Sequence, residues 1–208
     1  MGIMDGLIFV GNTPDFLADP LVFKRFCKGI PHGRKARKII WENQKRSSPL
    51  SLVFAIYSIE TSFRPCWVRV FEVAYLFVFT IRWLLTGMGF RDITVGTFQI
   101  GCHIVGDYTR AEYKRKGNYW YPKRSLKLAK AILSLPCFWF NVKVAMARIE
   151  QLWEEAMTLG YRFEDAVIYV GAWYNGNESY GRALLRIIYA INDSTPKTPY
   201  PWRGGSQL

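Results

Sequence analysis

Ser47-Ser-Pro-Leu-Ser-Leu-Val-Phe-Ala-Ile-Tyr-Ser-Ile-Glu-Thr-Ser-Phe-Arg-Pro65 is the stretch that decides the fold of this chain. It predicts a helix that starts near Ser47 or Ser48, where a serine hydroxyl can cap the first turn. Pro49 suits the first helical position, which needs no N–H donor. The helix has to stop before Pro65, because the residue ahead of a proline disfavours helical backbone.

Glu60 is the unusual residue of this helix. Apolar residues recur at helical spacing through Val53, Ile56 and Tyr57, and Glu60 is the next position on the same face. A carboxyl there is costly unless it is paired or protonated, and a partly buried acid with a raised pKa is what a general acid requires. In the alternative interpretation, Glu60 reaches water at a frayed helix end or pairs with Arg64.

Composition places the chain among folded, basic proteins. Its 208 residues suffice for one domain with a sizeable core, and half of them are hydrophobic. The formal net charge of +12 points to an anionic partner, such as nucleic acid, a membrane surface or a polyanionic cell wall. The aromatic residues lie in surroundings too apolar for a base-stacking platform, so no specific nucleic acid is expected.

Neither a metal site nor a cofactor is expected. The cysteines are isolated, and no histidine lies at ligand spacing from them. One or two disulfides are compatible with work outside the cytoplasm, but the sequence selects no pairing. The residues concerned are Cys27, Cys66, Cys102, Cys137, His32 and His103.

The apolar stretch Val68–Leu85 is a candidate membrane helix. Its uncharged run has only nine residues between Glu72 and Arg82, against the roughly 20 that a span needs. We expect a buried core helix whose charged residues point away from the core, with an interfacial membrane helix as the alternative. The face predicted to be buried consists of Val70, Ala74, Phe77, Val78, Ile81 and Leu85.

The rest of the chain is mostly helical in pattern. Asn141–Leu159 is the clearest amphipathic helix, and two more are expected after it. Glycines at both ends of Gly87–Gly101, with β-branched residues between them, predict a loop or small hairpin. The further helices are expected at Phe163–Tyr174, from Asn177 or Ser179 through Ile191, near Arg110–Glu112, near Ser125–Leu135, and within the basic segment up to Arg46.

Three short stretches carry the candidate chemistry, and they follow one another in a suggestive order. They are Ile59-Glu-Thr-Ser-Phe-Arg-Pro65, Thr94-Val-Gly-Thr-Phe-Gln-Ile100, and Ala172-Trp-Tyr-Asn-Gly176 with the adjoining Ser179-Tyr-Gly-Arg-Ala-Leu184. Over residues 48–190 they resemble the goose-type lysozyme and lytic transglycosylase superfamily. In that family a helix-terminal Glu followed by Ser or Thr precedes a Gly-x-x-Gln-Ile turn, and an Ala-Tyr-Asn motif follows on a later helix.

The chain departs from the family pattern at several places. Thr61 stands where Ser is commoner, Phe98 where many members have Met, and Trp173 separates Ala172 from Tyr174. The segment between Glu60 and the glycine turn is also longer than in minimal members. These departures leave the assignment of Glu60 as the catalytic acid unchanged, but they make the positions of the substrate subsites less certain to match those of the family.

The resemblance implies a mainly α, lysozyme-like (α+β) single domain with a small β-hairpin element over residues 47–192. A partly helical basic segment, residues 1–46, precedes it, and a flexible tail, residues 193–208, follows. The implied activity is cleavage of the β-1,4 bond from N-acetylmuramic acid to N-acetylglucosamine in peptidoglycan, with Glu60 as general acid and base. No cofactor is implied.

The resemblance also implies a set of substrate-binding residues. The amide of Gln99 would contact the sugar's N-acetyl group or Glu60, and Gly96 would let the turn approach the substrate. Tyr174 would orient Glu60 or stabilise developing charge, and Asn175 would bind sugar or fix its helix end. Phe98 and Trp173 would line the cleft. Turn, cap and core roles are the alternatives for Gln99, Asn175 and Tyr174.

The need for a second carboxylate distinguishes glycoside hydrolysis from transglycosylation. A hydrolytic glycosidase usually needs one, and the nearest candidates, Asp92 and Asp107, lie outside the matched positions. A lytic transglycosylase uses one Glu as acid and then as base, so we favour that reaction. A muramidase of the same fold and a non-enzymatic basic protein that binds nucleic acid or a membrane surface remain the alternatives.

The expected setting is the cell wall or periplasm. The small size suggests a specialised wall-opening enzyme of a phage, or of a secretion or conjugation system, with peptidoglycan strands as partner. Met1–Val10 lacks a basic region and carries Asp5, so it is a poor signal peptide, and the export route is unidentified.

Overall fold

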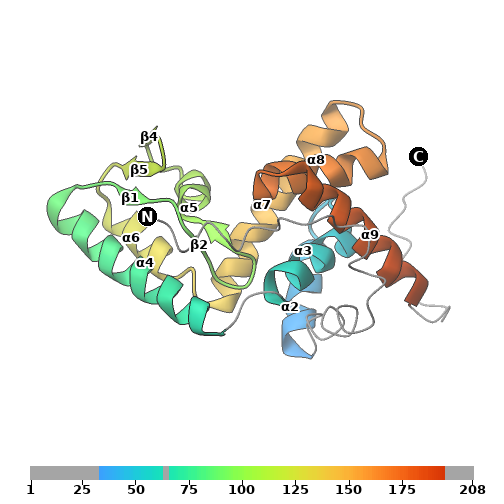
Figure 1. Ribbon diagram of the computed structural model, residues 1–208, viewed down its shortest axis with the longest axis horizontal. Helices are drawn as coiled ribbons and strands as arrows, with labels where there is room; N and C mark the ends of the chain where they lie inside the picture. Colours follow the sequence, from blue (N-terminus) through green and yellow to red (C-terminus); the bar gives the residue numbers. More distant parts are fainter. Residues whose placement is uncertain (1–32, 63–65, 195–208) are drawn as a thin grey trace.

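The computed structural model describes residues 33–62 and 66–194, which form eight helices and five short strands. Figure 1 shows them as two lobes joined by the long helix α7. One lobe holds α4, α5, α6 and the strands, and the other holds α2, α3, α8 and α9. The helices are α2 (Arg34–Asn43), α3 (Leu50–Ser62), α4 (Cys66–Thr86), α5 (Cys102–Tyr108), α6 (Leu126–Leu133), α7 (Phe138–Thr158), α8 (Phe163–Asn175) and α9 (Glu178–Ser194). The strands are β1 (Phe90–Arg91), β2 (Thr94–Val95), β3 (Ile100–Gly101), β4 (Tyr113–Lys116) and β5 (Tyr119–Pro122).

The mainly helical architecture with a small antiparallel β element is as the sequence predicts. Strands β2 and β3 form a hairpin in which Val95 pairs with Ile100, inside the glycine-bounded stretch. Strands β1, β5 and β4 form a separate antiparallel sheet in that order. The strand pair Tyr113–Lys116 and Tyr119–Pro122 was not foreseen from the sequence.

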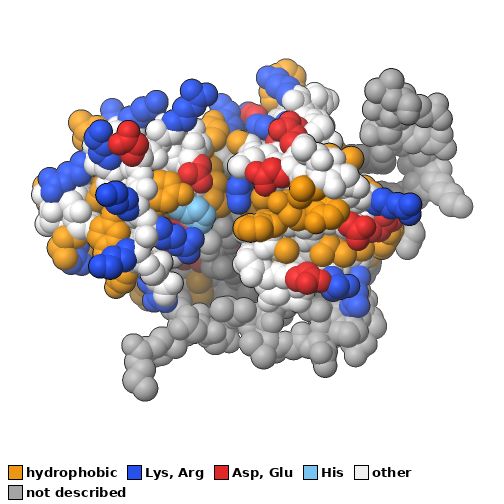
Figure 2. Space-filling view, turned by 90° about the horizontal axis from the view of Figure 1, so that it is seen from above, with side chains coloured by type: hydrophobic (Ala, Val, Ile, Leu, Met, Phe, Trp, Pro, Cys, Tyr) orange, Lys and Arg blue, Asp and Glu red, His pale blue; other side chains and the backbone are white. Residues whose placement is uncertain are grey.

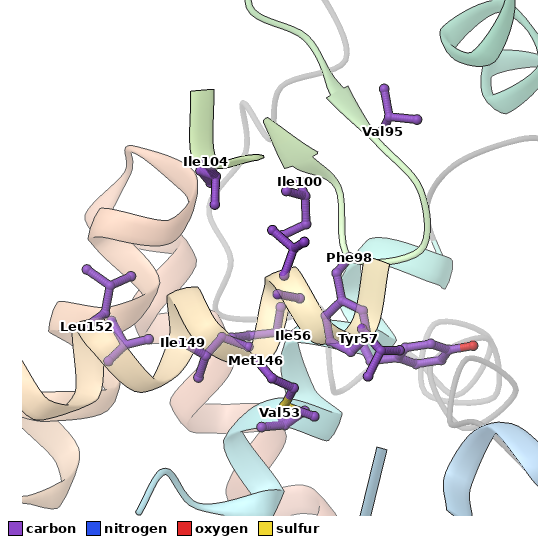
Figure 3. Packing of buried hydrophobic residues seen from close by; sticks show 14 of the residues in the cluster. Val53, Ile56, Tyr57, Val95, Phe98, Ile100, Ile104, Met146, Ile149 and Leu152 are labelled. Atoms are coloured by element: carbon purple, nitrogen blue, oxygen red, sulfur yellow. The ribbon is translucent and has the colours of Figure 1, made fainter. Parts of the chain in front are cut away.

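Helix α3 is the centre of the core. It is buried on nearly all sides from Leu52 to Glu60, rather than along one stripe. Figure 3 shows its Val53, Ile56 and Tyr57 beside side chains of α7 and of the β2–β3 hairpin. An apolar helix enclosed on all sides buries more surface than an amphipathic one, so α3 anchors both lobes.

The start of α3 differs from the expected capped end. The hydroxyl of Ser47 donates to the Glu150 carboxylate of α7 over 2.8 Å, and the Ser48 hydroxyl donates to Asn43. The backbone N–H groups of both serines also donate to Glu150. The serines therefore tie the start of α3 to α7, and the helix itself begins at Leu50.

Helix α4 is present, but its predicted orientation is wrong. The face expected in the core is exposed: Leu85, Val70 and Phe77 are 75%, 68% and 55% exposed. Glu72, expected to face solvent, is buried. The reason is that α4 is apolar around most of its circumference, and Glu72 has an inward partner in Gln99.

One further local prediction is wrong. Arg110–Glu112 is not helical: Arg110 has a positive φ of 57°, and the preceding helix, α5, already ends at Tyr108. Within 33–62 and 66–194 no single helix is long and apolar enough to cross a membrane, although α6 and α7, bent by 105°, meet that test together by length and composition.

Helices α8 and α9 pack unusually closely. A Cβ added to Gly171 would lie 2.4 Å from the Cα of Gly181, so neither position has room for a side chain. This contact brings the end of α8 against the start of α9 and places Tyr174 beside Tyr180, with parallel rings 6.5 Å apart.

Candidate functional site

Glu60 lies in the last turn of α3. It is 6% exposed, and Oε1 accepts a hydrogen bond of 2.8 Å from the hydroxyl of Tyr180 on α9. Burial of this kind is the condition under which a carboxyl can keep a proton near neutral pH. The Tyr180 hydroxyl fixes the orientation of the carboxyl group.

Arg69 connects the end of α3 to the turn between β2 and β3. Its Nη2 donates to the backbone carbonyl of Glu60 over 3.0 Å, and its Nη1 donates to the carbonyl of Gly96 over 3.2 Å. One guanidinium thus bridges the first and second of the motif stretches. A planar, permanently charged fork suits this role, because it can serve two carbonyls in a fixed geometry.

Tyr174 connects the third stretch to the second. Its hydroxyl donates to the backbone carbonyl of Phe98 over 2.5 Å. Burial raises the pKa of Tyr174 well above its ordinary value, the nearby charge of Glu60 raises it further, and Arg148 acts in the opposite direction. The phenol therefore remains a donor, and Tyr180 rather than Tyr174 is the tyrosine that orients Glu60.

Asn141 at the start of α7 shapes the β2–β3 turn. Its Oδ1 accepts from the Phe98 N–H over 2.8 Å, and its Nδ2 donates to the Val95 carbonyl over 2.9 Å. Gly96, with φ of 85°, lies against it: an added Cβ would come within 2.3 Å of Asn141 Nδ2. The contact with Asn141 therefore leaves no room for a side chain at position 96.

Gln99 is buried and its amide is already engaged. Nε2 donates to the Gly96 carbonyl over 2.8 Å and to Glu72 over 3.3 Å, and Oε1 accepts from Thr94 over 2.8 Å. This corrects the expectation that the amide contacts a sugar or Glu60. Gln99 also has a positive φ of 51°, so it is a structural residue of the turn.

Phe98 does not line a cleft. It is fully buried and packs edge-on against Tyr57, with ring centroids 5.3 Å apart. Trp173, by contrast, is 61% exposed. Asn175 is exposed as the last residue of α8, ahead of Gly176 in the left-handed conformation. Of these three, only Trp173 and Asn175 are accessible to a ligand.

The remaining acids near the hairpin are engaged as well. The Asp92 carboxylate lies against Nδ1 of His103, and Glu72 accepts a hydrogen bond from Gln99. Burial raises the pKa of Tyr113, and the charge of Asp107 and the hydrogen bond between the two side chains raise it further. Asp92, Asp107 and Glu72 therefore each have a partner of their own near the hairpin.

No family model matches this chain. Comparison with curated proteins and with solved structures gives no match either. Among residues 33–62 and 66–194, no cluster of three or more His, Cys, Asp or Glu side chains is placed to hold a metal ion.

The outer surface is strongly basic over one lobe. Figure 2 shows lysine and arginine side chains gathered on the lobe that carries the strands, and the surface hollowed between the two lobes. Strand β4 contributes Lys114, Arg115 and Lys116, all exposed. A polyanionic strand approaching this face would meet a favourable field.

Tyr180, Arg69 and Asn141 are the site residues that sequence reasoning missed. Tyr180 lies in the Ser179–Leu184 part of the third motif stretch, so the sequence marked its position, but no role was predicted for it. No sequence pattern marked Arg69 or Asn141, because each forms hydrogen bonds with backbone groups that are distant in sequence.

Proposed function

We propose that this chain is a peptidoglycan-cleaving lytic transglycosylase with a lysozyme-like fold and Glu60 as its general acid and base. The observation that carries the proposal is a set of hydrogen bonds that joins three separated stretches of the chain around Glu60. Tyr180 binds the Glu60 side chain, Arg69 links Glu60 to Gly96, and Tyr174 binds Phe98.

The reaction needs one acid that changes role. Glu60 donates its proton to the glycosidic oxygen as the bond from the N-acetylmuramic acid C1 breaks, and the N-acetylglucosamine leaves as an alcohol. The resulting carboxylate takes the proton of the muramyl C6 hydroxyl, whose oxygen bonds to C1. The product is a 1,6-anhydro end, no water is consumed, and Glu60 is protonated again.

The surroundings of Glu60 favour this use of a single group. Burial stabilises the protonated acid before cleavage, and the Tyr180 hydroxyl can stabilise the carboxylate after it. The basic lobe would attract an anionic wall strand to the hollow between the lobes.

A muramidase of the same fold is the second candidate, because Asp92 lies in the segment leading into the β2–β3 hairpin and is 14% exposed in its pair with His103. The two candidates differ in product. Hydrolysis leaves reducing ends on the released fragments, whereas transglycosylation leaves anhydro ends.

The test is digestion of purified peptidoglycan by wild type and by Glu60→Gln, with mass spectrometry of the fragments. We expect anhydro-muropeptides from wild type and at least a thousandfold lower rate from the variant. Glu178→Gln is the matched control, since Glu178 is an exposed acid paired with Arg182 on the same helix as Tyr180. Equal digestion by wild type and Glu60→Gln, or none by wild type, refutes the proposal.

A further inference from the structure

The outward face of α4 is a continuous apolar surface. The helix has 21 residues, which at 1.5 Å each make it about 31 Å long. Its exposed apolar side chains extend over about half of the circumference at 3.6 residues per turn. They are Trp67, Val70, Phe71, Val73, Ala74, Phe77, Val78, Ile81 and Leu85. Soluble surfaces rarely expose apolar patches of this extent without a binding partner.

The opposite side of α4 is firmly packed. Leu76 and Trp83 are buried, and the Trp83 indole N–H donates to the Pro122 carbonyl over 3.0 Å. Figure 1 shows α4 along the outer edge of its lobe, with α6 and β1 on its inner side. The exposed face is therefore held in place by the fold and is not the result of a detached helix.

The charged side chains that the structure describes at the edge of this face are those of arginines. Glu72, the only acid of α4, is buried towards Gln99, while Arg82 is exposed at the edge with its guanidinium over Phe79. The Arg124 guanidinium lies against Gly87, just beyond the helix end. An apolar ridge edged by arginines and lacking an exposed acid is complementary to an anionic lipid surface.

We propose that α4 docks this protein on the surface of an anionic lipid bilayer. The helix lies parallel to the membrane, its apolar side chains enter the boundary between headgroups and acyl chains, and Arg82 and Arg124 contact lipid phosphates. The paired aromatic residues Trp67 and Phe71, with centroids 6.2 Å apart, supply side chains that favour the membrane interface. This inference does not depend on the proposed enzymatic function.

The shape of the face favours a bilayer over a protein partner. Side chains such as Phe77, Val78 and Leu85 project from a convex ridge, whereas a helix-in-groove complex would need a partner that encloses half of α4. A fluid bilayer accommodates such a ridge without a preformed groove. A second copy of the chain, or residues 1–32 of the same chain, are the competing occupants.

Flotation of the full chain with vesicles tests the proposal. The vesicles contain phosphatidylcholine alone, or three parts phosphatidylcholine to one part phosphatidylglycerol. We expect wild type to float with the anionic vesicles and Phe77→Gln/Val78→Gln to show at least tenfold weaker partitioning. Arg82→Gln should weaken binding to anionic vesicles about fivefold and leave binding to neutral vesicles unchanged.

Met157→Gln/Leu159→Gln is the matched control. Met157 of α7 and the residue that caps its C-terminal end, Leu159, are 49% and 60% exposed, which is similar to the exposed fractions of Phe77 and Val78. It should float like wild type, and circular dichroism should show all variants folded. Three results overturn the proposal. In the first, wild type does not float with the vesicles. In the second, Phe77→Gln/Val78→Gln floats as well as wild type. In the third, a photo-crosslinker at position 77 reacts with a second copy of the chain or with residues 1–32 while vesicles are present.

Discussion

The Tyr180 hydroxyl and Oε1 of Glu60 lie 2.8 Å apart, although the two residues are 120 positions apart in the chain. This bond joins the start of α9 to the end of α3 inside the core. Because the Tyr174 ring stacks on Tyr180 and its hydroxyl reaches Phe98, the same cluster also contacts the β2–β3 turn. A substitution at any one of these residues should therefore alter the position of the Glu60 side chain.

Tyr180→Phe tests whether the hydroxyl positions Glu60. Peptidoglycan digestion should fall roughly tenfold to hundredfold, since a misplaced catalytic group costs rates of that order. The limb of the pH–activity profile that reports ionisation of Glu60 should move to higher pH, because a donor to the carboxylate is lost. Tyr189→Phe, which removes a similar bond to Glu164 on the surface, should change neither. If Tyr180→Phe digests peptidoglycan more slowly but keeps the pH–activity profile of wild type, Tyr180 has a structural role only.

Gly96→Ala should destabilise the protein by about 2–4 kcal/mol, through a strained positive φ and overpacking against Asn141. Urea unfolding followed by circular dichroism measures the change. Gly117→Ala is the control, because Gly117 also has a positive φ, 57°, but nothing lies within 4 Å of its added Cβ. Equal losses for the two variants would show that crowding by Asn141 contributes nothing.

Asn141→Ala should destabilise the fold by about 3 kcal/mol, because it leaves the Phe98 N–H and the Val95 carbonyl buried without their partner. Asn175→Ala, at an exposed helix end, should change the free energy of unfolding by less than about 0.5 kcal/mol. Thermal and urea unfolding measure both. A stable Asn141→Ala protein would mean that the hairpin turn does not depend on this side chain.

Glu150 should make stability depend on pH. Burial by itself would raise the pKa of Glu150, but hydrogen bonds from the backbone and side chains of Ser47 and Ser48 outweigh it and lower the pKa below its ordinary value. A lowered folded-state pKa adds stability that is fully present above the unfolded-state value and is lost as pH falls through the folded one. Glu150→Gln should therefore destabilise the protein at pH 7 and differ much less from wild type near pH 3. A difference that is constant over this range contradicts the assignment.

The two described free thiols should react very differently. Burial, with the nearby charge of Asp92, raises the pKa of the Cys102 thiol, whereas Cys137 is exposed. Iodoacetamide treatment of the native protein followed by peptide mapping should label Cys137 within minutes and Cys102 only after denaturation. Rapid native labelling of Cys102 would show that the β3–α5 junction opens.

The sequence by itself determined the helical elements and the position of the hairpin. Apolar periodicity and glycine boundaries are local signals, so α3, α7 and α8 begin and end within a few residues of the predicted positions. The same local signals marked Glu60 as an acid at the end of an apolar helix, and the structure shows that carboxyl to be buried.

Only the tertiary structure decided which side chains meet. Helix α4 is apolar on most sides, so its periodicity did not specify the inward face, and the Gln99–Glu72 contact placed an acid there instead. The sequence also assigned the orienting role to Tyr174, whereas the close approach of Gly171 and Gly181 sets Tyr180 on Glu60. Contacts between distant segments depend on how whole helices pack, and no local pattern encodes that geometry.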